Sequence, residues 1–206
     1  MSRHMNRHSP STAPGEAGSP AAPVRRGPRT RSAETLDRLL EAAHDQVRAV
    51  GHDDLTVRSV AARAGVSPAT AYTYFSSKQH LVAELFARTL DAMPRTPASG
   101  EPVERLAAAI GDVTDFLASE PELAAATTAS LLSQDEDVAR VRVQIGTWFY
   151  RRFRDALGPD ADPVWLELAE LAFFGATVEA GMGMATYEQV GERLQRLLRT
   201  LSEGRR

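Results

Sequence analysis

Residues 56–81 read TVRSVAARAGVSPATAYTYFSSKQHL, and this stretch predicts two short helices joined at one glycine. Thr56 has a hydroxyl that can cap a helix start, and apolar residues follow it at helical spacing. Gly65 ends that helix, because glycine adopts the left-handed conformation without a Cβ penalty. Ser67 and Pro68 then supply an N-cap and a proline at the first helical position, which start a second helix of about two turns. This layout is typical of a DNA-reading helix-turn-helix.

The second helix of the pair carries small and hydroxylated side chains in its first turn. Such groups permit close approach to the major groove, where methyl and hydroxyl groups contact thymine methyls and base edges. Phe75 is instead expected to fill the space between the helices. We expect bases to be faced by Pro68, Ala69, Thr70 and Thr73, with Ser67 beside them on the DNA-binding surface.

The run from Gly65 to Phe75, followed by Ser77, Lys78 and an apolar helix, resembles the DNA-binding head of the TetR (tetracycline-repressor-like) family. The resemblance covers roughly residues 32–81, and the glycine hinge, the Tyr-x-Tyr-Phe motif and the Ser-Lys helix start occur in the family's order. Ala71 stands where the family usually has a larger aliphatic residue, which predicts that this helix packs less firmly on its neighbour.

The resemblance and the side-chain chemistry together assign tasks within this head. Tyr72 and Tyr74 match family positions that contact the DNA backbone or pack beneath it, and Tyr72 is the one expected to contact a phosphate. Arg58 matches a position that reaches a base in some relatives, and arginine can bond guanine in bidentate fashion. Thr56 and Lys78 lie at or near helix starts, where N–H groups or an ammonium meet phosphates.

The formal charge of -3 is unevenly distributed over the 206 residues. Residues 1–78 hold 11 basic and 7 acidic residues, a net of +4, whereas the remainder holds 13 basic and 20 acidic residues, a net of -7. A basic half that contains the helix-turn-helix is expected if that half contacts DNA phosphates. Chance clustering of charge is the alternative.

Several classes of protein are disfavoured by what the sequence lacks. The chain has no cysteine, which removes disulfides and thiolate chemistry. It has no phosphate loop and no His-Glu-x-x-His motif, and all five histidines lie at or before His80, so we expect no enzyme, cofactor or metal site. No stretch approaches the roughly 18 apolar residues that span a bilayer, and no signal peptide is recognisable, so we expect a cytoplasmic protein without a membrane partner.

Residues 1–29 hold five prolines, three glycines and four serines but no Leu, Ile or Phe, which predicts a disordered basic tail. Arginines at its end are suited to contact phosphates or a minor groove, or simply to aid solubility. These arginines are Arg25, Arg26, Arg29 and Arg31. We expect a helix-turn-helix DNA-binding domain over residues 30–78 and a ligand-binding and dimerisation domain over residues 79–206.

The whole pattern predicts an all-α protein of about nine helices and no strand. Ser32 caps a first helix whose apolar stripe runs to Gly51. The segment 93–100 contains two prolines and a glycine, so it cannot continue the helix that begins after Ser76 or Ser77. Further helices are expected at 103–118, 122–133, 136–157, 163–183 and 186–203.

The predicted helix 163–183 is apolar on nearly every side, so it must be covered on every side. Together with the final helix it resembles half of a symmetric four-helix interface, and the corresponding pair makes the homodimer in TetR-like proteins. Two recognition helices held about 34–36 Å apart would read a near-palindromic double-stranded operator. The expected interface comprises Trp165, Leu168, Ala172, Gly175, Glu179, Val190, Leu194, Leu197 and Leu201.

Large aromatic residues and methionines in the body are suited to an apolar ligand, although their spacing is also typical of ordinary core packing. TetR-like bodies commonly enclose an effector pocket, so the resemblance implies a small hydrophobic or amphipathic effector. Arg151, Arg152 and Arg154 would either neutralise an acidic ligand or form a solvated basic face. The candidate lining residues are Phe116, Leu131, Trp148, Phe149, Phe153, Phe174 and Met182.

These observations predict a DNA-binding transcriptional regulator. The resemblance implies a repressor that is released from its operator when an effector binds the body in a conformation with misplaced recognition helices. Reciprocity then requires the operator to weaken effector binding equally. The alternative is an architectural or adaptor protein that uses the helix-turn-helix without any small-molecule ligand.

Overall fold

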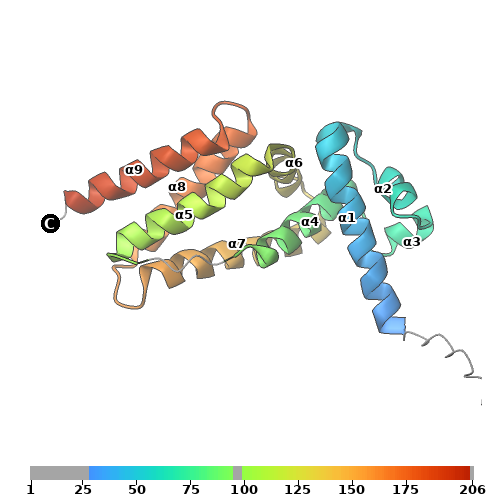
Figure 1. Ribbon diagram of the computed structural model, residues 1–206, viewed down its shortest axis with the longest axis horizontal. Helices are drawn as coiled ribbons and strands as arrows, with labels where there is room; N and C mark the ends of the chain where they lie inside the picture. Colours follow the sequence, from blue (N-terminus) through green and yellow to red (C-terminus); the bar gives the residue numbers. More distant parts are fainter. Residues whose placement is uncertain (1–27, 95–98, 205–206) are drawn as a thin grey trace, which may run out of the picture.

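A computed structural model describes residues 28–94 and 99–204, and these segments contain nine α-helices and no strand (Figure 1). The all-α prediction is therefore confirmed. Helices α1 to α3 form one end of the molecule, α4 leads away from them, and α5 to α9 form an elongated body (Figure 1). No described helix is long and apolar enough to cross a membrane. The predicted tail lies outside the described residues except for its last two positions.

The first helix, α1 (Pro28–Asp54), starts earlier than the predicted cap at Ser32. Proline is compatible with the first turn of a helix because its missing N–H would have no partner there. At Gly51 the backbone has φ 72° and ψ -176°, so the regular helix ends at this glycine as predicted. The chain then turns toward the helix-turn-helix through the fully buried Leu55.

The predicted caps of α2 (Val57–Arg63) and α3 (Pro68–Tyr72) are present. Thr56 accepts from the backbone N–H of Ser59 at 3.0 Å, and Ser67 accepts from that of Thr70 at 3.1 Å. Gly65 has φ 66°, and the N–H of Val66 beyond it donates to the carbonyl of Ala61 at 3.0 Å. These bonds satisfy the end of α2 and turn the chain sharply into α3.

Helix α3 has five residues rather than the predicted two turns, because the chain leaves helical geometry after Thr73. The N–H groups of Tyr74 and Phe75 both donate to the carbonyl of Ala71, which closes a turn. Phe75 is 2% exposed and fills the space between the head helices as expected. Ala71 is fully buried, so α3 rests directly on the head core through a small side chain.

Helix α4 (Lys78–Ala92) joins the two ends of the molecule, since it contacts α1 on one side and α6 and α7 on the other. Its cap is Ser77, not Ser76, and the Ser77 hydroxyl accepts from the N–H of His80 at 3.0 Å. The body helices lie within two residues of their predicted bounds. They are α5 (Pro102–Ser119), α6 (Pro121–Leu131), α7 (Glu136–Leu157), α8 (Val164–Gly181) and α9 (Tyr187–Glu203).

Candidate nucleic-acid interface and effector cavity

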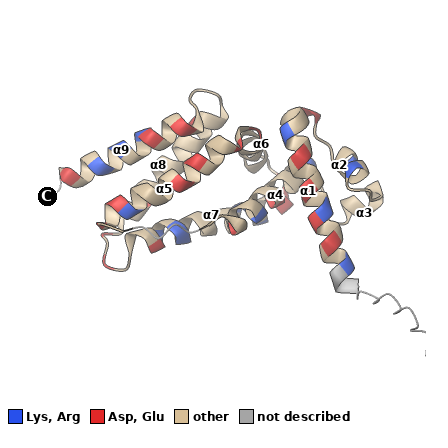
Figure 2. Ribbon diagram, viewed as in Figure 1, with Lys and Arg blue, Asp and Glu red and all other residues tan. Residues whose placement is uncertain are grey.

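The predicted DNA-binding residues gather around α2 and α3, on the far side of the head from the body. Helix α3 carries no charged residue, whereas its neighbour α2 carries arginines (Figure 2). A helix that enters a DNA groove lies between two rows of phosphates. Uncharged side chains on α3 and basic side chains on the neighbouring α2 suit such a position. Exposed members of the set are Thr56, Arg58, Ser67, Pro68, Ala69, Tyr72 and Thr73, and partly buried members are Thr70, Tyr74 and Lys78.

Hydrogen bonds hold the hydroxyl groups of α3 in place. The Ser67 Oγ and Thr70 Oγ1 atoms lie 2.8 Å apart, and the Thr73 hydroxyl donates to the Thr70 carbonyl at 2.6 Å. The Tyr74 hydroxyl is 3.0 Å from the Ser32 hydroxyl, which attaches the turn after α3 to α1. Tyr72 is 51% exposed, so it is the tyrosine whose hydroxyl is available to a phosphate.

The basic side chains of the head have different surroundings. Arg58 is exposed, whereas Arg63 forms an ion pair of 2.8 Å with Asp45 of α1. The Lys78 ammonium donates to the carbonyls of His52 and Asp53, at 2.9 and 3.1 Å. These carbonyls lie at the end of α1, so Lys78 anchors the start of α4 to that end, and its contact with a phosphate stays a prediction.

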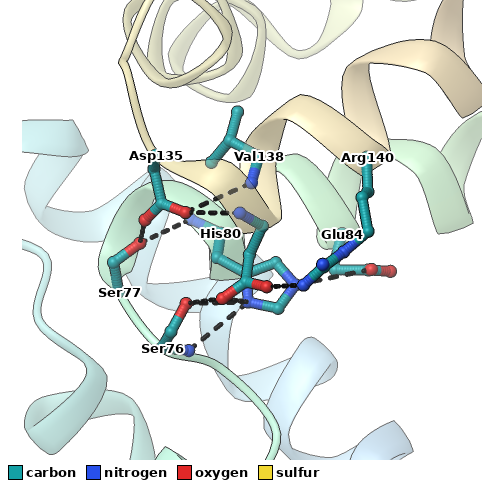
Figure 3. A network of polar contacts seen from close by, with 8 residues as sticks. Ser76, Ser77, His80, Glu84, Asp135, Val138 and Arg140 are labelled. Atoms are coloured by element: carbon teal, nitrogen blue, oxygen red, sulfur yellow. Dashed lines mark hydrogen bonds and ion pairs between the residues drawn. The ribbon is translucent and has the colours of Figure 1, made fainter.

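The head meets the body at a polar cluster that we call the joint, formed by Ser76, Ser77 and His80 with Asp135 and Asp137 (Figure 3). The Ser77 hydroxyl donates to Asp135 at 2.6 Å and the Ser76 hydroxyl donates to Asp137 at 2.5 Å. Each of these serine hydrogen bonds lowers the pKa of its aspartate. The cap of α4 is thereby bonded to the N-cap of α7.

Asp135 accepts hydrogen bonds from both sides of the joint. Its other carboxylate oxygen accepts from the N–H groups of Asp137 and Val138, which caps α7 (Figure 3). A second contact between head and body lies at the other end of α6, where His44 Nε2 of α1 is 3.1 Å from the Glu120 carboxylate. The head is therefore bonded to the residues that flank α6 at both of its ends.

The body contains an apolar cavity of about 60 Å³ between α4 and the five body helices. The predicted residues Leu131, Phe149 and Phe174 line it. The remaining wall is apolar or hydroxylated, and no charged side chain belongs to it. Besides those three, the lining comprises Phe86, Leu117, Ala124, Thr127, Thr128, Ile145, Phe173, Thr177 and Tyr187.

Four predicted ligand residues lie elsewhere. Phe116 stacks near Phe86 from outside the lining, with ring centroids 6.5 Å apart, and Phe153 is fully buried in the core. Met182 is 62% exposed beyond the end of α8. Trp148 lies in a separate surface depression, where the Arg152 guanidinium is 5.2 Å from its ring.

The comparison with known proteins agrees with this geometry. The family described as bacterial regulatory proteins, tetR family, matches residues 39–85. Over 167 residues the chain is 44% identical to the HTH-type transcriptional regulator Rv0767c of Mycobacterium tuberculosis, which covers 80% of this chain and 78% of the relative. The chain belongs to the TetR family. It is a DNA-binding transcriptional regulator rather than an enzyme.

Other similar regulators share less of the sequence with this chain. The chain is 30% identical to the HTH-type transcriptional repressor KstR of Rhodococcus jostii over 139 residues, 66% of this chain and 65% of KstR. A TetR transcriptional regulator from Rhodococcus sp. RHA1 has the same fold, with a TM-score of 0.71 and 22% identity over 83% of this chain and 97% of that one. The regulator FadR of Bacillus subtilis, solved in complex with stearoyl-CoA, gives a TM-score of 0.54 and 20% identity over 79% and 96%.

In this TetR-family chain the predicted dimer residues divide into two groups. Trp165, Val190 and Leu194 are at most 8% exposed and pack into the chain's own core, which leaves little of their surface for a contact between chains. The rest of the set lies at the surface of α8 and α9. Gly175, Leu197 and Leu201 are exposed, Leu168 and Ala172 are partly exposed, and Glu179 binds Arg193 of α9 at 2.9 Å.

Sequence reasoning missed the joint and most of the cavity wall. Asp135 lies between the predicted helices 122–133 and 136–157, and its place immediately before a helix is typical of an N-cap. Its bond to Ser77 spans 58 positions, so no local pattern reveals it. Thr127 and Thr128 likewise carry no motif, and only the packing of α6 against α7 and α8 shows that they line a cavity.

Proposed function

We propose that this TetR-family regulator is a homodimeric repressor that is released from a near-palindromic operator by a small hydrophobic or amphipathic effector. Helix α3 of each subunit enters the major groove, while Arg58 and Tyr72 contact the DNA beside it. Support comes from the exposure of these residues and from the hydrogen-bonded hydroxyls of α3. The name of KstR, a transcriptional repressor, supports repression over activation.

The homodimer is supported by an apolar stripe on α8. Val164, Leu168, Leu171, Gly175 and Met182 recur at intervals of three, four or seven residues, which places them along one side of the helix. Leu171 is 70% and Val164 is 52% exposed. Leu197 and Leu201 of the neighbouring helix α9 are also exposed. A second copy of the same pair of helices would cover this surface across a two-fold axis.

The observation that carries the repressor mechanism is the position of α6. Its residues Ala124, Thr127, Thr128 and Leu131 line the cavity. The residues that flank α6, Glu120 and Asp135, are bonded to the head through His44 and Ser77. A molecule that displaces α6 therefore also displaces α1 and α4, and with them the reading helix.

The volume of the cavity fits this coupling. Pockets that enclose a drug-sized ligand usually measure about 300–1,000 Å³, whereas this cavity measures about 60 Å³. An effector larger than a few atoms must push the surrounding helices apart, and α6 is one of its walls. The effector thus binds more tightly to a conformation of the body in which these helices lie further apart. This difference in affinity between the two conformations supplies the coupling free energy between effector binding and DNA binding.

Acyl-CoA compounds are the first effectors to test, because FadR of Bacillus subtilis was solved in complex with stearoyl-CoA. FadR of Thermus thermophilus was solved with lauroyl-CoA. An acyl chain matches the apolar wall of the cavity, and its head group would remain outside the helices.

The small volume of the cavity also favours a second candidate function. An architectural or adaptor DNA-binding protein needs the helix-turn-helix but no pocket for a ligand. Its DNA affinity would not respond to any acyl compound, which makes the two candidates separable by one titration.

The test begins by selecting a duplex from a random pool with the full chain. Fluorescence anisotropy then gives the affinity for that duplex with and without lauroyl-CoA or stearoyl-CoA. We expect a near-palindromic duplex and an affinity that falls at least tenfold with one of the two compounds. An affinity unchanged by both supports the architectural protein, and a chain that selects no duplex contradicts both candidates.

A further inference from the structure

Helix α6 contributes Thr127 to the wall of the cavity. Thr127 is 4% exposed, and its Oγ1 atom has no hydrogen-bond partner among the described residues. Building on the proposed effector site, we infer that this hydroxyl binds a neutral polar group on an otherwise apolar effector. The matching groups are a carbonyl, as in a ketone, ester or thioester, and an alcohol hydroxyl.

The other threonines of the cavity wall show how unusual Thr127 is. Thr128 donates to the carbonyl of Ala124 at 3.1 Å, and Thr177 donates to that of Phe174 at 3.0 Å. A threonine within a helix normally satisfies its hydroxyl in this way, by bonding to a carbonyl three or four positions earlier. Thr127 does not, although it is more than nine-tenths buried.

A second hydroxyl reaches the same cavity from α9. The Tyr187 hydroxyl lies 3.5 Å from Thr128 Oγ1, at the outer limit of a hydrogen bond, and the side chain is buried. Burial raises the pKa of the Tyr187 phenol, so this group is a neutral donor at ordinary pH. The polar side chains of the wall are therefore hydroxylated residues of α6, α8 and α9.

The side chains of the wall also determine which polar group of an effector can be buried in the cavity. No charged side chain lines the cavity, so a buried carboxylate would have no counter-charge. Transfer of an unpaired charge into an apolar site costs far more than transfer of a neutral polar group. A free fatty acid is disfavoured in the cavity, whereas a neutral carbonyl or hydroxyl of the same chain length is favoured.

The test uses three short probes of equal chain length, 2-hexanone, 1-hexanol and hexanoate, titrated into the full chain by calorimetry at neutral pH. We expect 2-hexanone and 1-hexanol to bind at least tenfold more tightly than hexanoate. Thr127→Val keeps the shape of the side chain and removes its hydroxyl, so it should weaken binding of both neutral probes about tenfold. Thr127→Ser keeps a hydroxyl and should retain most of the affinity.

Ser130 provides a matched control on the same helix. Its side chain is fully buried and its Oγ atom also lacks a partner among the described residues, but it does not belong to the cavity wall. Thr127→Val and Ser130→Ala should both raise the melting temperature, because each removes a buried hydroxyl without a partner. Only Thr127→Val should weaken probe binding.

Three results would overturn the inference: no binding of either neutral probe, equal binding of hexanoate, or unchanged probe affinity in Thr127→Val. Duplex binding is measured on the same preparations. A chain that binds its selected duplex but fails the probe test contradicts the ligand assignment alone. A chain that binds no duplex contradicts the proposed function itself.

Discussion

The head and the body of this regulator differ most in the surfaces that they leave uncovered. Among the described residues, the exposed large hydrophobic side chains of α1 to α4 are Val50 and Tyr72. The body exposes many more, and Leu171 and Val143 each reach 70%. A surface that binds hydrated phosphates must itself be polar, whereas a surface that binds another apolar surface must not be.

The hydroxyl groups of the two regions also differ in how they are bonded. In the head, the hydroxyls of Ser67, Thr70 and Thr73 bond to one another or to the backbone. In the body, the hydroxyls of Thr127 and Ser130 are buried without a partner among the described residues. The hydroxyls around α3 are thus held in one arrangement, while the body keeps buried hydroxyls without a described partner and a cavity that a ligand can use.

The largest effect should come from charging the apolar surface of the body. Leu171→Glu places a carboxylate in the proposed dimer interface, where its burial without a partner should weaken dimerisation about a hundredfold or more. Sedimentation equilibrium measures the association. Val143→Glu, at an equally exposed position on α7, should leave the dimer intact. A Leu171→Glu protein that remains dimeric would show that α8 is not the interface.

Loss of one hydroxyl on the reading surface should have the next largest effect. Tyr72→Phe removes the exposed phenol expected to bind a phosphate, and hydrogen bonds to charged groups contribute about 1.5–3 kcal/mol. We expect the affinity for the selected duplex to fall at least about tenfold in anisotropy titrations. Tyr150→Phe removes a comparably exposed hydroxyl from the body and should leave DNA binding unchanged. Equal affinities for the two variants would remove Tyr72 from the contact set.

Two glycine substitutions should change the stability in opposite directions. Gly65 has φ 66° and open space around its Cβ position, so Gly65→Ala meets only backbone strain and should destabilise the protein by about 1–2 kcal/mol. Gly146 lies within α7 and also has open space, so Gly146→Ala should stabilise by roughly 0.5–1 kcal/mol. Urea unfolding measures both. A stabilising Gly65→Ala would contradict the left-handed turn between α2 and α3.

The smallest effect concerns Lys78, for which sequence and structure suggest different tasks. A lysine that contacts a phosphate contributes about 0.9 to the slope of log affinity against log salt. Because its ammonium bonds to the carbonyls of His52 and Asp53, we expect Lys78→Ala to lower the stability by roughly 1 kcal/mol or less. The salt slope should stay within experimental error of the wild-type value. A slope reduced by about one unit would restore the phosphate contact.

Local patterns accounted for the caps of α2 and α3 and for the turn between them. The caps at Thr56 and Ser67 and the left-handed Gly65 are determined within a few residues of chain, so the sequence shows them directly. Patterns were less informative about which apolar residues face another chain. Trp165 and Val190 recur at the same helical spacing as Leu168 and Leu197. The first two lie in the core of the single chain, whereas the other two reach its surface.

The sequence by itself determined the nine helices, the hinge at Gly65 and the exposed reading surface, because capping and hydrophobic periodicity act over one or two helical turns. The tertiary structure alone decided which residues of α6 line a cavity, which residues of α8 stay uncovered, and that Ser77 bonds to Asp135. These features depend on how distant helices pack against one another, and a helical period is the same whether a residue faces its own core, a ligand or a partner.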